Sequence, residues 1–519
     1  MIVNRYLRQE GIVDQDALSQ LQVLVTGSAN GIADVLVLLD QLGVSSTSGR
    51  IGIYQNEEVN PDSVFWNLAF PETSSFRDLS HMQPEKYLIV EDLQTSNDWD
   101  IHLSINGSIE LPNTIYARIN GPRAFVSMHP ISDATEIQSN HPLTPSLRIA
   151  CCSVLVERMM RTLGLTNRLV VSDAWTTATY RIETTDLEQA NAVIQAKGFE
   201  NAAVNFQPSS DGLATLARIR LPQHLQMNAY DYVSVEKETS GQLNDLDVGL
   251  IPWSDTDSSI NQVFDVEEND VVVLGAGGLG SWCAPLIVQS LPAGQLHIVD
   301  SDEEVEEHNL NRQVLYNEQH IGQAKADVGQ KRLNEINSNI QVHGYVEHLL
   351  PCHVSQDTWD EEEDIAVDDL DDAIDSGLSQ ALQSSKLYFA CLDNMKARTL
   401  LNEAALLHEA DFINGGSESI HGIVERLSND EGCMVCRYGK QAANEVEVVS
   451  CTEEGARPIA SIVTTTAWAG AMMAAIGLIQ SSHLNGTVLP RFQWHKGSVN
   501  RMIAGSKPPW MDEPCLRHI

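Results

Sequence analysis

A long internal repeat constrains the fold most, because two copies of one pattern in the same order imply two copies of one domain. The matched stretches are 21–43 with 269–291, 49–61 with 294–307, 85–93 with 385–394, 144–165 with 457–478, and 168–183 with 488–503. Within each copy, β-branched apolar runs alternate with helical stretches, which is typical of a doubly wound α/β sheet. Residues 5–184 and 262–519 therefore predict two tandem α/β units.

Between the copies lies a segment of different character. Residues 184–199 have a helical pattern and 213–222 a strand pattern, which predicts a small α+β segment that ends in a Ser/Asp-rich linker. We place the domains at 1–184, 185–261 and 262–519 and assign no function to the middle one.

The net charge and the cysteine content indicate which partners and which cellular setting suit this chain. With 32 Lys and Arg against 71 Asp and Glu, the net charge is −39, so nucleic-acid phosphates would repel the chain and a basic protein partner is favoured. The acidic run 357–377 is either a solvated stretch or a docking surface for such a partner. Nine scattered cysteines and a start without a signal peptide indicate a reducing, cytoplasmic setting.

One stretch has the length of a membrane span. Residues 458–480 carry no charge, but their high content of Ala, Gly and Thr predicts a buried pair of small-residue helices instead. We therefore expect no association with a membrane.

The second copy carries a phosphate-binding pattern directly after its first strand. The stretch GAGGLG contains Gly275, Gly277, Gly278 and Gly280. Such glycines permit a tight turn and a close approach of the backbone to phosphate, and the following helix N-terminus presents free N–H groups. Asp300 ends the next strand, where a carboxylate can accept hydrogen bonds from ribose. Alone, this pattern fits NAD as well as ATP.

Residues further along favour ATP. Asn309, Arg312, Gln313 and Lys325 follow Asp300, and an arginine fork with a lysine point charge suits an enzyme that reacts at the α-phosphate. A dinucleotide dehydrogenase has no need of this cationic pair. Asp393 follows a later apolar strand, at the edge of the sheet where a carboxylate can hold Mg²⁺ against a triphosphate.

In this order, the motifs resemble the ThiF/MoeB/ubiquitin-activating superfamily, whose members adenylate the C-terminal glycine of a ubiquitin-fold protein. The segments that carry the resemblance are GAGGLG, DSD at 300–302, NLNRQ at 309–313, GQAK at 322–325 and CLDN at 391–394. It implies Rossmann-like adenylation domains that use ATP and Mg²⁺, with Asp300 for ribose, Arg312 and Lys325 for phosphates, and Asp393 for Mg²⁺. The stretch 300–309 is one residue longer than in bacterial sulfur-carrier members, which weakens the match at Asn309 and Gln313.

The first copy has lost this pattern. Its turn reads GSANGI from Gly27, so Ala29 and Ile32 stand where the second and third glycines belong, and their Cβ atoms would crowd a pyrophosphate. Gln55 replaces the ribose carboxylate, and no NLNRQ segment follows. We expect that this half does not bind ATP.

The first copy nevertheless contains RYLRQEG at 5–11, which resembles the family's RYxRQ element. In homodimeric members, the second arginine of that element reaches the partner's ATP site. The resemblance implies that Arg8 acts on the nucleotide of the second copy, like an arginine finger. One chain would then be a fused pseudo-dimer, with an inactive domain at 1–184 and an active domain at 262–519, and further oligomerisation is left open.

One cysteine is a candidate nucleophile. Cys451, followed by Thr452, Pro458 and an apolar helix, resembles the thioester cysteine of ubiquitin-like activating enzymes. Its thiolate could take the acyl group from AMP, and Arg457 would favour that thiolate. Cys352, in a predicted loop, is a rival. The other candidates have apolar neighbours and are predicted core residues: Cys151, Cys152, Cys283 and Cys391.

Two half-sites predict zinc. Cys433 and Cys436 form one pair, and Cys515 and His518 form another, and zinc favours four such ligands in a tetrahedral site. Sulfur-carrier members of the family carry two such pairs in comparable places. Because protein atoms fill all four positions, the predicted role is structural.

The sequence thus predicts an ATP- and Mg²⁺-dependent enzyme that activates a ubiquitin-like protein ending in glycine. Cys451 would form the thioester, and a conjugating enzyme would receive the acyl group; a prokaryotic conjugation operon, for example one used in defence, is the context that fits. One alternative is a sulfur-carrier adenylyltransferase of the MoeB/ThiF type, in which Cys451 would handle persulfide or acyl-disulfide chemistry. Another is a non-catalytic scaffold or a nicotinamide-dependent oxidoreductase, against which Arg312, Lys325 and Asp393 argue.

Overall fold

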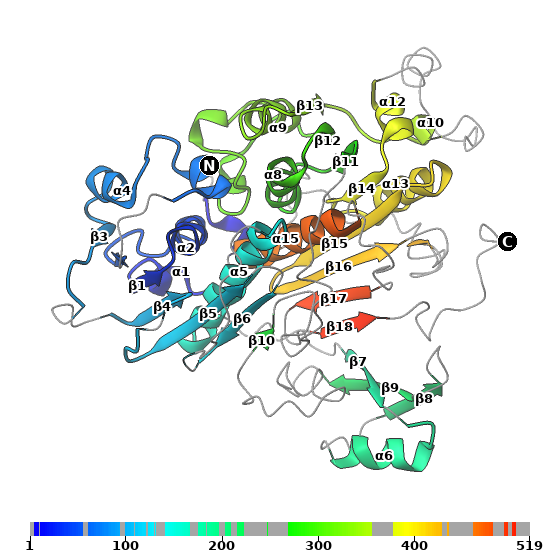
Figure 1. Cartoon of the computed structure of the whole chain (residues 1–519), viewed down its shortest axis with the longest axis horizontal. Coiled ribbons are helices and arrows are strands. Elements are labelled where there is room, and N and C mark those ends of the chain that lie inside the picture. The colour runs from blue at the N-terminus through cyan, green and yellow to red at the C-terminus, as the bar shows by residue number, and fades with distance from the viewer. Residues whose placement is uncertain are drawn as a thin grey trace.

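The computed structural model describes most of the chain. The described residues are 5–9, 11–55, 61–93, 99–107, 109–120, 123–128, 130, 141–166, 175–182, 184–196, 203–208, 215–222, 246–247, 268–354, 377–427, 433–434, 460–480, 492–496 and 501–504. They form two mainly parallel sheets with helices and one small antiparallel sheet (Figure 1). We call 5–166 the N-terminal half and 268–504 the C-terminal half.

The sheet of the N-terminal half has the order β10-β6-β5-β4-β1-β2-β3. Its strands are β1 Gln22–Gly27, β2 Arg50–Tyr54, β3 Tyr87–Ile89, β4 Ile101–Ile105, β5 Thr114–Asn120, β6 Arg123–Ser127 and β10 Leu246–Asp247. The strands from β3 to β5 run parallel, whereas β6 and β10 run antiparallel to their neighbours. Near-continuous burial along β1 and β4 is what a parallel sheet covered on both faces requires.

Helices surround this sheet. They are η1 Leu7–Gln9, α1 Gln15–Leu18, α2 Ala29–Leu42, α3 Val64–Ala69, α4 Phe76–Met82 and α5 Thr144–Thr162. Local signals explain their ends: Ser75 caps α4 by accepting from the Asp78 N–H, and Gly43 ends α2 in the left-handed conformation. The long helix α5 is mostly buried and packs on α2 and β5.

The sheet of the C-terminal half has the order β13-β12-β11-β14-β15-β16-β17-β18. Its strands are β11 Val271–Leu274, β12 Gly294–Val299, β13 Ile340–Tyr345, β14 Leu387–Ala390, β15 Asp411–Glu418, β16 His421–Leu427, β17 Phe492–Lys496 and β18 Arg501–Ala504. Its helices are α8 Gly280–Ser290, η3 Glu307–Asn309, η4 Glu318–His320, α9 Lys325–Asn334, α10 Pro351–Val354, α12 Gly377–Ser384, α13 Met395–Leu407 and α15 Val463–Gln480.

The two large sheets share one strand order, which confirms the predicted α/β class. The order β3-β2-β1-β4-β5-β6 in one half corresponds to β13-β12-β11-β14-β15-β16 in the other. One predicted match is wrong, however. The stretch 85–93 contains the edge strand β3, which corresponds to β13, whereas 385–394 contains β14, whose counterpart is β4. The two stretches have similar apolar sequences, but their strands occupy different positions in the two sheets.

The small sheet also differs from the predicted repeat. It consists of β7 Trp175–Ile182, β9 Thr215–Pro222 and β8 Ala203–Pro208, with α6 Leu187–Ala196 in the same segment. Because β7 pairs with β9 and not with the first large sheet, the match of 168–183 to 488–503 fails. The predicted boundary at 184 therefore falls inside this unit, between β7 and α6.

The two halves share a continuous core. The central helix α15 of the C-terminal half packs on α5 of the other half and on α8, and the two helices α5 and α15 lie side by side (Figure 1). Phe65 and Trp282 meet across this interface with ring centroids 4.7 Å apart, and Arg332 donates to the Leu68 carbonyl oxygen at 2.7 Å. The halves are thus held together by packing and by buried hydrogen bonds.

Within the described residues, α15 is the one helix long and apolar enough to cross a membrane, judged by length and composition. Almost all of it is buried inside the molecule, as in the core helix of many soluble proteins. The predicted burial of this small-residue stretch is confirmed, but it forms one helix and not a pair. Small residues permit close packing, since a Cβ on Gly470 would lie 2.6 Å from the Leu279 carbonyl oxygen.

Candidate nucleotide site

The glycines of the turn after β11 fall into two groups: some have no space for a Cβ, and one has open space beside it. Gly275 has φ +96°, and a Cβ on it would lie 2.5 Å from the Cys391 carbonyl oxygen. A Cβ on Gly280 would collide with the Gly275 carbonyl oxygen. At Gly277, by contrast, the nearest atom within 4 Å would be the Gln313 amide nitrogen, at 3.7 Å. Gly275 and Gly280 thus shape the turn, whereas Gly277 leaves one side of it accessible. At Gly278, a Cβ would lie 3.0 Å from the Thr466 methyl group on α15.

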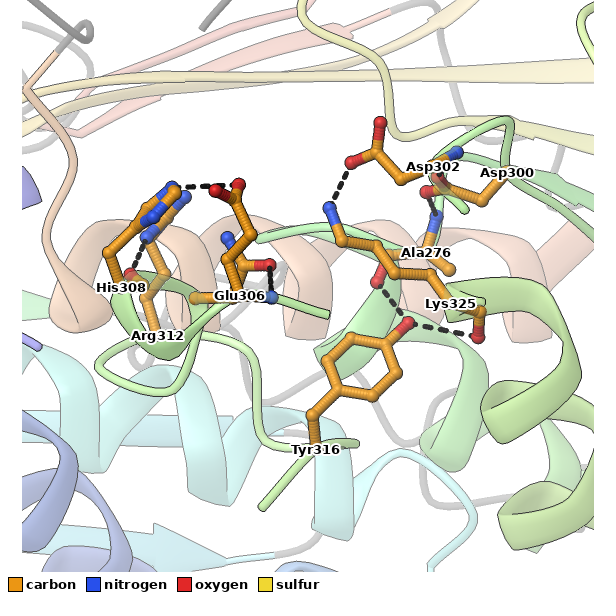
Figure 2. A network of polar contacts seen from close by, with 9 residues as sticks. Ala276, Asp300, Asp302, Glu306, His308, Arg312, Tyr316 and Lys325 are labelled. Atoms are coloured by element: carbon orange, nitrogen blue, oxygen red, sulfur yellow. Dashed lines mark hydrogen bonds and ion pairs between the residues drawn. The ribbon is translucent and has the colours of Figure 1, made fainter. Parts of the chain in front are cut away.

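Asp300 connects this turn to the loop after β12. Its carboxylate accepts from the Ala276 N–H at 2.6 Å and from the Asp302 N–H at 2.9 Å (Figure 2). Burial raises the pKa of the Asp300 carboxyl above its ordinary value, and the nearby charge of Lys325 opposes that rise. The predicted ribose ligand therefore also holds the glycine turn in place.

Lys325 stands at the first turn of α9, only 5% exposed. Its ammonium group pairs with the Asp302 carboxylate, and its backbone N–H donates to the Asp302 carbonyl oxygen at 3.1 Å (Figure 2). The Tyr316 hydroxyl donates to the Ala276 carbonyl oxygen at 2.9 Å and lies 3.3 Å from the Lys325 carbonyl oxygen. Tyr316 thereby joins the glycine turn to α9.

The segment NLNRQ forms a compact, buried turn around η3. Arg312, 6% exposed, donates through Nη1 to the His308 carbonyl oxygen at 2.7 Å and to Asn311 Oδ1 at 2.9 Å. Asn309 Oδ1 accepts from the Glu306 N–H at 3.0 Å, so Asn309 caps the turn. These contacts fix the guanidinium group before any ligand arrives.

Gln313 lies beside the turn and has one buried side-chain atom without a hydrogen-bond partner in the described part of the chain. It is 2% exposed, and its Oε1 has no hydrogen-bond partner among the described residues, while its amide nitrogen lies on the Gly277 side. Buried polar atoms without partners are rare and call for an explanation. A polar ligand at the open side of the turn would supply one.

Asp393 lies exposed in the turn between β14 and α13. The neighbouring Asn394 caps α13, because its Oδ1 accepts from the Ala397 N–H at 2.7 Å. Since β11 and β14 pair in parallel, with Leu274 opposite Ala390, Gly275 and Asp393 follow the same carboxyl edge of the sheet. Capping thus falls to Asn394, which leaves the Asp393 carboxylate available for a cation.

Arg8 comes to this site from the other half of the molecule. It lies in η1, 7% exposed, and its carbonyl oxygen accepts from the Ser461 N–H at 2.8 Å, just before α15. Burial, and then the charges of Arg312, Arg8 and Lys325, lower the pKa of His308 to about 4. Arg8 therefore lies close enough to act electrostatically on the turn that carries Arg312.

The corresponding turn of the N-terminal half differs in its backbone course. Gly27 has φ +124°, and a Cβ on it would collide with the Ile105 carbonyl oxygen, as at Gly275. Here, however, α2 begins already at Ala29, and Ile32 is wholly buried in the core. That the N-terminal half does not bind ATP stays a prediction.

Several predicted residues lie outside the described residues: Cys436, Cys451, Cys515, His518 and all but the last residue of the acidic run 357–377. Cys433 is described and buried, beside Met434, whose N–H donates to Asn402 Oδ1 at 2.8 Å. Across the described ranges, no group of three or more His, Cys, Asp or Glu side chains is arranged to hold a metal. The zinc site thus stays a prediction.

The remaining cysteines are buried. Cys151, Cys152, Cys283 and Cys391 are core residues, as predicted. Cys352 lies in the short helix α10 and not in a loop, and burial raises the pKa of its thiol. A buried thiol with a raised pKa is a poor nucleophile, so Cys352 is the weaker rival of Cys451.

Comparison with known proteins identifies the C-terminal half. Residues 259–500 match the model of the ThiF family. The match covers just under half of the chain, and it confirms the predicted resemblance to this family.

Curated relatives agree with this family. The chain is 29% identical over 174 residues to "Adenylyltransferase and sulfurtransferase MOCS3-1" of Zea mays, which covers 33% of this chain and 32% of the relative. It is 29% identical over 254 residues to MOCS3 of Culex quinquefasciatus (47% and 51%) and 27% identical over 199 residues to UBA4 of Candida albicans (38% and 39%). The chain thus spans about a third to a half of the length of these relatives.

Two solved structures are similar. PaaA, at 17% identity and a TM-score of 0.33, covers 46% of this chain and 64% of its own. MccB of E. coli, at 16% identity and a TM-score of 0.34, covers 47% and 65%.

Two residues of the site escaped the sequence analysis: His308 and Tyr316. His308 directly precedes NLNRQ, and Tyr316 follows that motif by three residues. Their proximity to motif residues was a usable signal, but only the fold shows that they contact the turn and the cations.

Proposed function

We propose that the C-terminal half binds ATP with Mg²⁺ and adenylates the C-terminal carboxylate of a small protein of the sulfur-carrier, ubiquitin-fold type. The observation that carries this proposal is the convergence of four features on one sheet edge. They are the open side of the glycine turn at Gly277, the buried cations Arg312 and Lys325, and the exposed carboxylate Asp393. Such a set suits phosphoryl chemistry, in which positioning and charge supply most of the catalysis.

In the proposed reaction, an oxygen of the carboxylate attacks the α-phosphorus of ATP. A new P–O bond forms, the bond to pyrophosphate breaks, and an acyl-adenylate results. Negative charge accumulates on the phosphate oxygens, which Arg312 and Lys325 would stabilise from fixed positions. Mg²⁺, held by Asp393, would neutralise further charge on the triphosphate.

We further propose that the two halves act as a fused pseudo-dimer with one working site. The shared strand order and the common core support this idea, as does Arg8, which reaches the C-terminal site from the N-terminal half. In this arrangement Arg8 would complete the cationic shell at the transferring phosphate. Because its carbonyl oxygen binds the Ser461 N–H, the backbone at Arg8 is fixed to the segment just before α15.

The two candidate functions differ in what happens to the acyl group after adenylation. The relatives are named both adenylyltransferases and sulfurtransferases, which favours the sulfur-carrier alternative over thioester formation and transfer to a conjugating enzyme. Thioester formation on Cys451 remains a second proposal, which rests on the Cys-Thr start and the Pro458 that precede an apolar helix.

Pyrophosphate release and intact mass separate these proposals. The full chain is mixed with ATP, Mg²⁺ and candidate ubiquitin-fold proteins that end in glycine. We expect pyrophosphate release that depends on the carrier and is lost in Asp393→Asn, with Glu409→Gln, an exposed change at the far end of α13, as the matched control.

The adduct then decides the next step. Acyl-adenylate without a covalent protein adduct would support the sulfur-carrier proposal. An adduct that hydroxylamine cleaves but a phosphine reductant leaves intact, and that Cys451→Ala abolishes while Cys352→Ala retains it, would establish the thioester instead. A carrier shown to bind without any pyrophosphate release would overturn both.

A further inference from the structure

The His308 imidazole has no role in the proposed function, although the residue contacts both Arg312 and Glu306. It lies in η3 and is 8% exposed. Its carbonyl oxygen holds the Arg312 guanidinium group, and its Nε2 lies 3.6 Å from Glu306 Oε2 (Figure 2). The imidazole is thus buried close to a carboxylate, on the turn that carries Arg312.

The charges around His308 come from four segments. Arg312 and Glu306 belong to its own turn, Arg8 comes from η1 of the N-terminal half, Lys325 from α9, and Asp302 from the loop after β12. Three cations face two carboxylates, so the surroundings carry a surplus of positive charge. A fourth cation there would be repelled by the other three and would lose solvation through burial.

We propose that His308 is a proton-binding residue of the nucleotide site, neutral in the free protein and protonated when the magnesium complex of ATP binds. This inference rests on the proposed function, because it requires nucleotide phosphates at this site. Magnesium-ATP is a net anion, and its arrival turns the surplus of positive charge into a surplus of negative charge. The imidazole then gains a proton from solvent and becomes the fourth cation beside the phosphates.

A titratable fourth cation has a physical advantage over a permanent one. Four fixed cations in a buried cluster would repel one another in the free protein and would destabilise the turn that holds Arg312. A histidine supplies its charge only when phosphate compensates it. The same proton makes nucleotide affinity depend on pH, which a purely structural histidine would not do.

The expected proton uptake follows from the two states. In the free protein, burial and the neighbouring cations hold the pKa of His308 at about 4. If the complex restores the ordinary imidazole pKa of about 6.5, roughly 0.7 of a proton enters per nucleotide at pH 6. Affinity should then be about fourfold higher at pH 6 than at pH 8 on account of this group alone.

Calorimetry of the full chain tests this directly. The magnesium complex of α,β-methylene-ATP is titrated at pH 6 in two buffers of different ionisation enthalpy, and the difference in heat gives the number of protons taken up. The variants are His308→Gln, which cannot titrate, and His343→Gln as the matched control, since His343 lies on β13 and bonds to Gln295 away from the cluster. Any proton uptake that remains in His308→Gln comes from other groups, such as the phosphates of the nucleotide.

We expect uptake in the wild type and in His343→Gln, with a decrease of roughly 0.7 of a proton in His308→Gln. Binding with equal uptake in the wild type and in His308→Gln would overturn the inference and leave the proposed function intact. Absence of binding in the wild type would overturn the proposed function and the inference with it. If His308→Gln alone fails to bind, a ¹⁵N titration of the wild-type imidazole decides: a pKa unchanged by nucleotide refutes the proposal.

Discussion

Three glycine-to-alanine substitutions distinguish glycines that the backbone requires from a glycine that leaves space for a ligand. Gly275 combines φ +96° with the close approach of the Cys391 carbonyl oxygen, which would lie 2.5 Å from an added Cβ. Gly164 has φ +70° but nothing within 4 Å, so Gly164→Ala isolates the cost of the backbone conformation alone. Gly277 has neither constraint, since it lacks a positive φ and its nearest neighbour is a flexible amide.

The three substitutions should therefore differ in kind. Left-handed backbone costs about 1–2 kcal/mol for a residue with a Cβ, which is the expected loss for Gly164→Ala. The forced contact adds about 1–3 kcal/mol, so Gly275→Ala should lose about 2–5 kcal/mol in total. Gly277→Ala should change stability by less than about 0.5 kcal/mol, yet weaken nucleotide binding at least about tenfold.

Thermal unfolding with and without Mg·ATP measures both properties. At about 2–4 °C per kcal/mol, Gly275→Ala should lower the transition temperature by roughly 4–20 °C and Gly164→Ala by roughly 2–8 °C. Without nucleotide, Gly277→Ala should unfold like the wild type, but saturating nucleotide should stabilise it by at least about 1.4 kcal/mol less. The reasoning fails if Gly275→Ala is no worse than Gly164→Ala, or if Gly277→Ala responds to nucleotide like the wild type.

Four further predictions concern other parts of the chain. Arg8→Ala should slow adenylation about 10²-fold, whereas Arg5→Ala, whose guanidinium group is bound to Asp40, should leave the rate nearly unchanged; equal rates for both variants would refute the role of Arg8. Arg332→Ala removes hydrogen bonds to the Leu315 and Leu68 carbonyl oxygens, so chemical denaturation should show a loss of about 1–3 kcal/mol. Burial lowers the pKa of His102 to about 4, so the unfolded chain binds more protons there and stability should decrease as pH decreases from about 6.5 to about 4, a dependence that His102→Gln should reduce in acid titrations of the melting temperature. Metal analysis of the purified chain should find one zinc ion, and its retention in Cys515→Ser would contradict the predicted ligand set.

Sequence alone predicted the fold class and the identity of the motif residues, and the reason is physical. A strand followed by GAGGLG constrains its own backbone, because the fold needs φ +96° at Gly275 and tolerates no Cβ at Gly280. Patterns of this kind are local and can be read directly. Sheet position is not local, which explains why the edge strand β3 was matched to the inner strand β14.

The same distinction explains the residues that sequence analysis missed. Tyr316 matters because its hydroxyl reaches the Ala276 carbonyl oxygen, forty residues away in sequence. His308 matters because Arg8, from the far end of the chain, and Lys325, from the next helix, both bring charge to it. Neither role is encoded in a neighbouring residue. The Tyr316 contact arises when the C-terminal half folds, and the approach of Arg8 to His308 arises when the two halves pack. In the proposed pseudo-dimer, the N-terminal half would be kept although it lacks the second and third glycines of the turn. It would supply Arg8 to the half that retains those glycines, and the packing between the halves fixes the Arg8 backbone.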